Sequence, residues 1–157
     1  MGEDESRRVI QLLRKEGVEY KLYEHEPVYT SEQASKARGV DLKTGVKAMV
    51  VKSLDRFFLA DIAADRRLDF RKLEKLLKVK RLEFATKEEV IAKTGCAAGS
   101  VHPVGWLFGL ETYLDQSVLE NEYVNFNIGL LTKSVRITKD DLLRILKPKS
   151  IDNFSKQ

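Results

Sequence analysis

Apolar and polar residues are arranged along the chain in patterns that predict short helices and strands. Between Val9 and Leu13 the apolar residues recur with the spacing of one helix face. Ser6 can cap the start of this helix, and Gly17 can end it. Residues 18–25 then alternate between apolar and polar, as expected of a strand with one buried face. The pattern therefore predicts a helix followed by a strand.

Two capping boxes predict further helices. Thr30 and Gln33 have the spacing that opens a helix ending near Gly39, and Thr86 and Glu89 repeat that spacing before a second helix. The same periodicities predict further helices at residues 69–77 and 138–146, and strands at residues 46–53, 55–62, 81–85, 111–117, 122–129 and 133–138. A tight turn at residues 54–56 makes the first two of these strands a hairpin.

Helices and strands interleave, and several of the strands must pair antiparallel. This order predicts an α+β fold in which helices surround one mixed, curved, barrel-like sheet. We see no internal repeat and no linker that would divide the chain. We therefore expect residues 1–157 to form a single domain.

The composition is that of a globular protein, with 43% hydrophobic and 33% charged residues. A single cysteine, Cys96, excludes an internal disulfide and fits a reducing compartment. The chain has no apolar stretch long enough to span a membrane. We therefore expect a cytoplasmic protein with no membrane partner.

Positive charge is concentrated between residues 66 and 81. That stretch holds eight Lys or Arg but only two acids, Asp69 and Glu74. Such a patch can neutralise nucleic-acid phosphates, but it is also what a solvated helix face looks like. The charge pattern alone leaves both interpretations open.

Lys47 stands just inside an apolar strand. Because strand side chains alternate between faces, Lys47 shares a face with Met49 and Val51. Its stem can pack on the sheet while its ammonium reaches water. Alternatively, the ammonium lies at the mouth of an apolar pocket, where it can bind a carboxylate, a phosphate or an ester oxygen.

Other chemistry has little support in the sequence. The chain has two histidines, His25 and His102, and no motif with metal-ligand spacing, so we expect no metal and no cofactor. Phosphate-binding loops, dinucleotide fingerprints and serine-hydrolase elbows are also absent. A nucleophilic pair of Cys96 with a histidine is possible on paper, but an inert buried cysteine fits the sequence equally well.

Several segments together resemble the YbaK/ProX family of aminoacyl-tRNA deacylases, which also includes the editing insertion of bacterial prolyl-tRNA synthetase. The order of features carries the resemblance: "GVKAMVVKS" around Lys47, then a G-x-x-x-P loop from Gly99 to Pro103, then an Asp-containing strand with Asp115. The similarity runs from about residue 9 to residue 146. "YEHEPVYTSEQASKARGV" and "VNFNIGLLTKSVRITKDDL" match as well.

The resemblance implies hydrolysis of the ester between a mischarged amino acid and the 3′ end of tRNA, most often tRNA for proline. The partners it implies are aminoacyl-tRNA and, as a further candidate, prolyl-tRNA synthetase, with no DNA. The family's essential lysine corresponds to Lys47, and the backbone of Gly99, Ser100 and Val101 is expected to stabilise the oxyanion. Residues expected to bind the substrate are Tyr29, Thr30, Ala48, Met49, His102, Pro103, Asp115, Asn127 and Gly129.

The position after the lysine departs from the family pattern. Relatives that remove alanine usually carry Asn there, and relatives that remove cysteine commonly carry Thr, whereas this chain has Ala48. The amino acid removed therefore stays open among alanine, cysteine, serine and threonine. His102 is either a partly exposed loop residue or a proton carrier near the ester. A non-catalytic module that binds aminoacyl-tRNA or a synthetase is the alternative to an enzyme.

Overall fold

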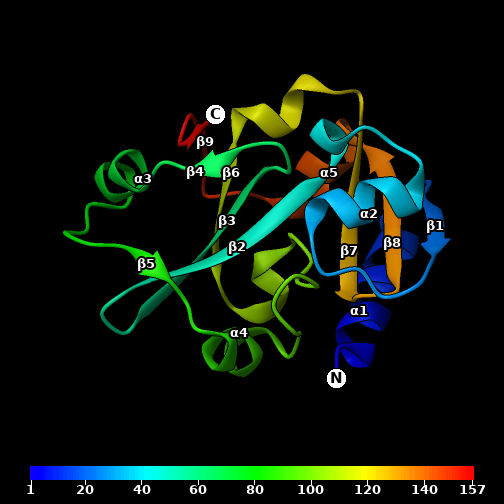
Figure 1. Cartoon of the computed structure of the whole chain (residues 1–157), viewed down its shortest axis with the longest axis horizontal. Helices are drawn as coiled ribbons and strands as arrows, with labels where there is room; N and C mark the ends of the chain where they lie inside the picture. Colours follow the sequence, from blue (N-terminus) through cyan, green and yellow to red (C-terminus); the bar gives the residue numbers. More distant parts are fainter.

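Five α-helices and ten β-strands form the protein in a computed structural model that describes all 157 residues (Figure 1). The helices are α1 (Glu3–Lys15), α2 (Ser31–Arg38), α3 (Phe70–Leu77), α4 (Lys87–Thr94) and α5 (Lys139–Leu146). The strands are β1 (Lys21–Glu24), β2 (Val46–Ser53), β3 (Arg56–Ala63), β4 (Arg67–Leu68), β5 (Glu83–Phe84), β6 (Glu111–Asp115), β7 (Tyr123–Leu130), β8 (Lys133–Thr138), β9 (Ser150–Asp152) and β10 (Ser155–Lys156). None of the helices combines the length and the apolar character needed to cross a membrane.

The largest sheet has five strands in the order β5-β2-β3-β6-β9. β2 and β3 form the predicted hairpin, which is antiparallel and closed by a two-residue turn in which Leu54 has a φ of 56°. β6 lies parallel to β3, and β9 lies parallel to β6. The register places Lys47 opposite Ile62 and Ala48 opposite Asp61.

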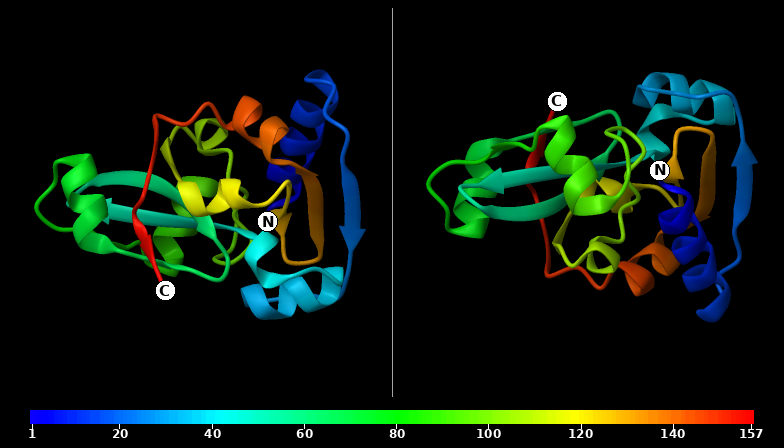
Figure 2. Two further views of the ribbon diagram at one scale, coloured as in Figure 1. Left: turned by 90° about the horizontal axis from the view of Figure 1, so that it is seen from above. Right: turned by 90° about the horizontal axis from the view of Figure 1, so that it is seen from below.

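A second, antiparallel sheet has the order β1-β8-β7, and β4 and β10 make a third pair. Seen from above and below, the three-stranded sheet lies at one end of the molecule while the β2–β3 hairpin extends toward the other end, where α3 lies (Figure 2). The two larger sheets touch through an isolated bridge between Gly45 and Asn125.

The prediction of a curved, barrel-like sheet was wrong. The strands divide into three separate sheets, and none of these closes on itself. Continuous hydrogen bonding around a ring is what closes a barrel. Here one isolated bridge at Gly45 is the only ladder contact between the two larger sheets, and the five-stranded sheet ends in the short strands β5 and β9. The expectation of a mixed fold of helices and strands was confirmed.

Both faces of β3 are buried, so its side chains reach two different hydrophobic clusters. Phe58, Ala60 and Ile62 pack with α3 on one face, and Leu59 packs beneath α4 on the other. A third and larger cluster joins α1, α5 and the β7–β8 pair. β3 therefore reads as nearly continuously apolar, as expected of a strand covered on both sides.

Most of the predicted helix boundaries were confirmed. Both capping boxes form, at Thr30 and at Thr86, and Gly39 ends α2 in the left-handed conformation. Ser6 is not a cap, because α1 begins at Glu3 and Ser6 lies buried inside the helix. No strand is predicted after residue 138, yet the C-terminal residues form β9 and β10.

Candidate active site

A pocket of about 390 Å³ lies along β2, between α2 on one side and β5 with α4 on the other. In Figure 1, α2 lies near the start of β2 and β5 lies near its end. The 21 residues that line the pocket include Lys47 and Arg38 but no Asp, Glu, His or Cys. A concave, mostly apolar site with two cations and no acid favours a ligand that carries negative charge or electron-rich oxygens.

Lys47 is half-buried in the pocket wall. Its Nζ donates a hydrogen bond of 2.6 Å to the backbone carbonyl of Arg66. Burial lowers the pKa of Lys47, and the nearby charges of Glu32 and Asp65 offset part of that effect. The ammonium is thus anchored within the protein and lines the pocket, rather than extending freely into water.

The edge of β2 beside the pocket lacks a partner strand. β5 pairs with β2 only at Val51 and Lys52, and the N–H of Ala85 donates to the carbonyl of Val50 at 3.0 Å. Alternate residues of a strand direct their backbone groups to the same side. Ala48, two residues before Val50, therefore presents its N–H and C=O toward the pocket.

Arg38 is a second cation in the pocket lining, and it has no carboxylate partner. Its Nη2 donates to Oδ1 of Asn127 at 3.1 Å, while its buried Nε has no hydrogen-bond partner. Burial lowers the pKa of Arg38 to about 10, so the guanidinium stays charged at neutral pH. An unpartnered N–H on a buried cation is costly, which favours a ligand acceptor at this point.

Asn127 connects Arg38 to the glycine-containing loop. Its Nδ2 donates to the carbonyl of Gly99 at 2.7 Å, and its Oδ1 also accepts from Ser134 Oγ at 2.9 Å. Gly99 has a φ of 90°, a conformation that favours glycine. Arg38, Asn127 and Gly99 therefore hold one another in place on the same side of the pocket.

Of the expected oxyanion donors, two remain free. Gly99 and Val101 line the pocket, and their N–H groups have no partner within the chain. Ser100 is buried, and both its N–H and its hydroxyl donate to the carbonyl of Ala97. The Ser100 carbonyl accepts from the N–H of Gly129 at 2.8 Å. Ser100 and Gly129 thus hold the loop in place by hydrogen bonds and do not line the pocket.

His102 lies away from the pocket and is completely buried. Its ring stacks on Phe108 at 4.2 Å, and its Nδ1 accepts from the N–H of Val104. Burial lowers the pKa of His102 to about 3, so the ring is neutral at physiological pH. It is neither partly exposed nor placed to carry a proton to a ligand in the pocket.

Cys96 is buried as well. Burial raises the pKa of its thiol to about 12, which removes the thiolate that a nucleophilic pair needs. The chain contains no cluster of three or more potential metal ligands. Neither thiol chemistry nor a resident metal is built into the pocket.

Eight of the thirteen expected site residues line the pocket, and five do not. Asp115 is buried elsewhere, where its carboxylate accepts from the N–H of Phe154 at 2.7 Å and from Ser155 Oγ at 2.6 Å. Lining the pocket are Tyr29, Thr30, Lys47, Ala48, Met49, Gly99, Val101 and Asn127; outside it lie Ser100, His102, Pro103, Asp115 and Gly129.

Two residues at the pocket were missed from the sequence. Arg38 is the last residue of a predicted helix, and only the basic side chain at that end hints at its role. Phe84 lies in the short strand β5, lines the pocket, and is 49% exposed. An aromatic residue on a strand otherwise reads as a core residue, so its exposure could not be seen in advance.

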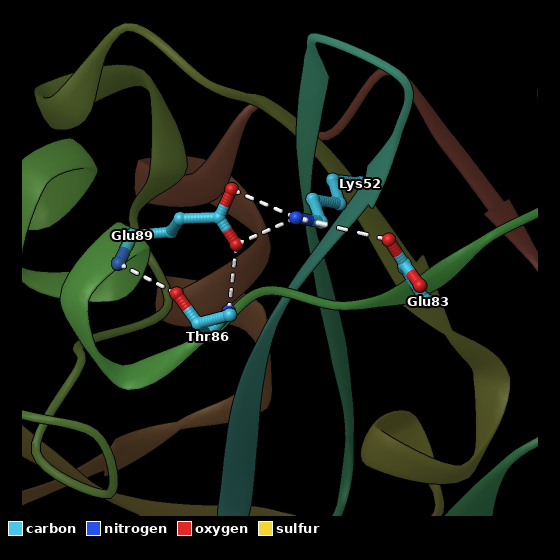
Figure 3. A network of polar contacts seen from close by, with 4 residues as sticks. All are labelled: Lys52, Glu83, Thr86 and Glu89. Atoms are coloured by element: carbon cyan, nitrogen blue, oxygen red, sulfur yellow. Dashed lines mark hydrogen bonds and ion pairs between the residues drawn. The ribbon is translucent and has the colours of Figure 1, made fainter.

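A polar network fixes α4 and β5 to β2 (Figure 3). Lys52 Nζ donates to both carboxylate oxygens of Glu89 at 2.8 Å and lies 3.7 Å from Glu83. Glu89 also accepts from the N–H of Thr86, which completes the capping box. The network sets the start of α4, whose other end leads into the loop at Gly99.

Known proteins resemble this chain over most of its length. A family model described as an aminoacyl-tRNA editing domain matches residues 25–145. The multifunctional Ser/Thr-tRNA deacylase ProXp-y of Escherichia coli is 33% identical over 150 residues, which cover 92% of this chain and 90% of that protein. A proline–tRNA ligase of Caldicellulosiruptor saccharolyticus is 35% identical over 103 residues, which cover 65% of this chain but 17% of the ligase.

Solved structures share the same fold. A crystal structure described as a candidate trans-editing enzyme for prolyl tRNA synthetase superposes with a TM-score of 0.85 at 29% identity. The match covers 98% of each chain. The chain therefore shares its overall fold with this crystal structure.

Proposed function

The chain belongs to the aminoacyl-tRNA editing domain family, and from this premise we propose that it removes serine or threonine from mischarged tRNA. It is a trans-editing hydrolase that cleaves the ester between the amino acid and the terminal ribose. The observation that carries the assignment of the site is the pocket along β2, which holds two cations and free backbone donors but no acid.

Hydrolysis proceeds by addition and elimination. The oxygen of a water molecule attacks the ester carbonyl carbon, and the carbonyl electron pair moves onto its oxygen to form a tetrahedral oxyanion. The bond from carbon to the ribose oxygen then breaks as the carbonyl re-forms. The ribose oxygen takes up the proton that the water has lost, which leaves a free amino acid and a free tRNA end.

The pocket supplies charge and orientation rather than a nucleophile. Because no carboxylate, imidazole or thiol lines it, the proton passes through water or the ribose hydroxyl beside the ester. The free N–H groups of Gly99 and Val101 are suited to the oxyanion. Lys47 and Arg38 are suited to the oxygens of the terminal nucleotide, and both act in the charged form.

Ala48 is placed to affect which amino acid is removed. Its backbone N–H and C=O face the pocket, and its small side chain leaves room beside them. The name of the Escherichia coli relative favours serine and threonine among the four candidates. A site that donates a hydrogen bond to a substrate hydroxyl discriminates strongly against an analogue without one.

The substrate indicates the partner and the cellular compartment of the protein. The similarity to prolyl-tRNA synthetases makes such a synthetase a candidate partner that delivers mischarged tRNA. We place the protein in the cytoplasm, where aminoacyl-tRNA is made and used.

A deacylation panel tests the function. Purified protein is mixed with tRNA carrying alanine, cysteine, serine, threonine or proline, and loss of the ester is followed with time. We expect the fastest loss for seryl- and threonyl-tRNA. Lys47→Ala should lower kcat/KM by roughly 10- to 150-fold, as for loss of a hydrogen bond from a charged donor to the terminal nucleotide, while Lys47→Arg keeps the charge and should retain more activity.

The pH dependence of the deacylation rate independently tests whether the charge of Lys47 is needed. Since burial lowers its pKa, activity that needs the ammonium should decline at a pH below that expected of an ordinary lysine. Lys47→Arg should remove that decline. Tight binding without turnover on any tRNA would favour the non-catalytic module, and full activity in Lys47→Ala would disprove the role of the lysine.

A further inference from the structure

Six exposed cations on and after α3 have no ion-pair partner. The basic stretch contains eight Lys or Arg, of which Arg66 and Arg67 are used in hydrogen bonds to the C-terminal residues Ser155 and Gln157. The acids of the stretch are also engaged, because Asp69 caps α3 and Glu74 accepts from the N–H of Leu82. The six that remain are Arg71, Lys72, Lys75, Lys78, Lys80 and Arg81.

An exposed aromatic ring, Phe84, lies three residues after the last of these cations and at the edge of the pocket. Phe84 lines the pocket and is 49% exposed, so one part of its ring faces the ligand site and another faces solvent. Its ring packs edge-to-face on Phe70, the first residue of α3, with 4.9 Å between ring centroids. That packing fixes the orientation of the ring and joins it to the basic helix.

We propose that Phe84 and the exposed cations of α3 and the α3–β5 loop bind the single-stranded 3′ end of the tRNA. A base near the 3′ end stacks on Phe84, and the phosphates that precede it lie along Arg71 and Lys75, which are four residues apart on the same side of α3. This inference rests on the proposed function, because the aminoacyl ester must lie in the pocket beyond Phe84.

The exposed cations and the exposed ring of Phe84 together favour single-stranded nucleic acid as the ligand of this surface. An aromatic platform beside a row of cations is how proteins hold single-stranded nucleic acid without reading its sequence. An acidic protein segment would match the charge, but it would leave the exposed face of Phe84 without a stacking partner. A trans-acting enzyme needs such a surface, because the pocket itself holds only the aminoacyl end.

The cations are tested with Arg71→Gln, Lys72→Gln and Lys75→Gln combined in one variant. KM for aminoacyl-tRNA should rise at least about tenfold, while kcat/KM for an aminoacyl-adenosine, which lacks the preceding phosphates, should not change. The slope of log affinity against log salt should fall by about 2, because each phosphate that is neutralised on a single strand adds about 0.7 to that slope. The matched control combines Arg7→Gln, Arg8→Gln and Lys15→Gln on α1 and should leave all three measurements as in the parent protein.

The platform is tested with Phe84→Leu, which keeps an apolar side chain but removes the ring, and Phe84→Trp, which keeps a ring. Stacking on one base predicts a loss of affinity of roughly 5- to 150-fold for the leucine variant, whereas the tryptophan variant should bind as well as the parent protein. Thermal unfolding of both variants checks that they remain folded. Equal affinity of Phe84→Leu and Phe84→Trp would overturn the platform.

Affinity is measured with a tRNA whose amino acid is attached through an amide, because such a substrate is not hydrolysed. Weaker binding by the α3 and Phe84 variants supports the proposed surface. If the parent protein then hydrolyses no ester, the proposed function is wrong but the binding surface stands. Unchanged affinity and an unchanged salt slope in the α3 variant would overturn the surface, while turnover by the parent protein would leave the proposed function standing.

Discussion

Asp61 is a carboxyl group in the middle of β3 with no hydrogen-bond partner. Its side chain is completely buried, and both of its oxygens lack a partner. The register places it between Ala48 of β2 and Leu114 of β6. Burial raises the pKa of Asp61 well above its ordinary value of 3.8, which favours the protonated form in the folded protein.

Replacement of Asp61 should stabilise the protein in a pH-dependent way. The folded pKa lies above the unfolded one, so the unfolded state releases the proton first, and the stability of the parent protein falls as pH rises from about 4 toward the folded pKa. Asp61→Asn does not titrate, so its stability advantage should grow over this range. Asp61→Leu should gain roughly 1–3 kcal/mol at pH 8, the usual cost of an unpartnered buried polar group.

Urea unfolding at pH 4, 6 and 8 measures these differences. Asp55→Asn, in the exposed hairpin turn, is the matched control and should change stability little at any of the three pH values. A stability difference between Asp61→Asn and the parent protein that stays constant from pH 4 to pH 8 would show that the carboxyl group finds a charge-stabilising partner in solution.

Single residues were the hardest features to predict from the sequence. Lys47 stands out because an ammonium inside an apolar strand conflicts with the local pattern, but only the resemblance to the deacylase family made it an expected site residue. Arg38 shows no such conflict, because a basic residue at the end of a helix is common. Its importance comes from its hydrogen bond to Asn127, which lies far from it in the sequence. Asp115 was placed in the site by its position in the order of features, but its partners Phe154 and Ser155 lie in the C-terminal tail.

At the scale of elements, the C-terminal strand β10 is joined to Lys47 by a chain of hydrogen bonds. Asp115 accepts from Ser155 Oγ at 2.6 Å, and Ser155 Oγ accepts from Nε of Arg66 at 2.8 Å. The carbonyl of Arg66 in turn accepts from Nζ of Lys47 at 2.6 Å. β10, which also pairs with β4, therefore holds the segment that anchors Lys47.

Changes to this network should affect stability and Lys47 together. Ser155→Ala should lower the free energy of unfolding by about 1–3 kcal/mol, because it removes two hydrogen bonds, one to Asp115 and one from Arg66. Asp115→Ala should cost more, because it leaves several buried donors without an acceptor. Since Arg66 is then held less firmly, kcat should fall more than KM rises. Denaturant unfolding and steady-state deacylation measure the two effects.

Lys156→Ala is the control for this prediction, since its side chain is exposed and lies next to Ser155 in the same strand. It should leave both stability and kcat close to those of the parent protein. A loss of stability in Ser155→Ala without any change in kcat would limit the tail to a structural role.

Elements with local signals were predicted well, and elements that depend on distant partners were not. The capping boxes at Thr30 and Thr86 lie within four residues, so sequence alone identifies them. β4, β9 and β10 have two or three residues each, too few to show a period, and they exist because they pair with distant segments. The prediction of a barrel-like sheet was wrong for the same reason, because the way strands assemble into sheets depends on pairing between distant segments.

At the scale of the whole molecule, the two larger sheets share one hydrophobic cluster. Val46 of β2 and Leu114 of β6 belong to the five-stranded sheet, yet they pack with Phe126 of β7 and with residues of β8, α1 and α5. A cluster that crosses between sheets couples their unfolding. This arrangement supports our proposal that residues 1–157 form a single domain.

The single cysteine and the single tryptophan report on different parts of the molecule and so test that proposal. Buried Cys96 belongs to the cluster beneath α4, whereas Trp106 donates from Nε1 to the carbonyl of Ile145 in α5 at 2.8 Å. In urea, exposure of the thiol to a labelling reagent and the change in tryptophan fluorescence should have the same midpoint. Phe126→Ala, in the shared cluster, should destabilise the protein by roughly 3–5 kcal/mol and move both midpoints together. If the fluorescence midpoint moves while the thiol midpoint stays, the two sheets unfold independently and the chain consists of two domains.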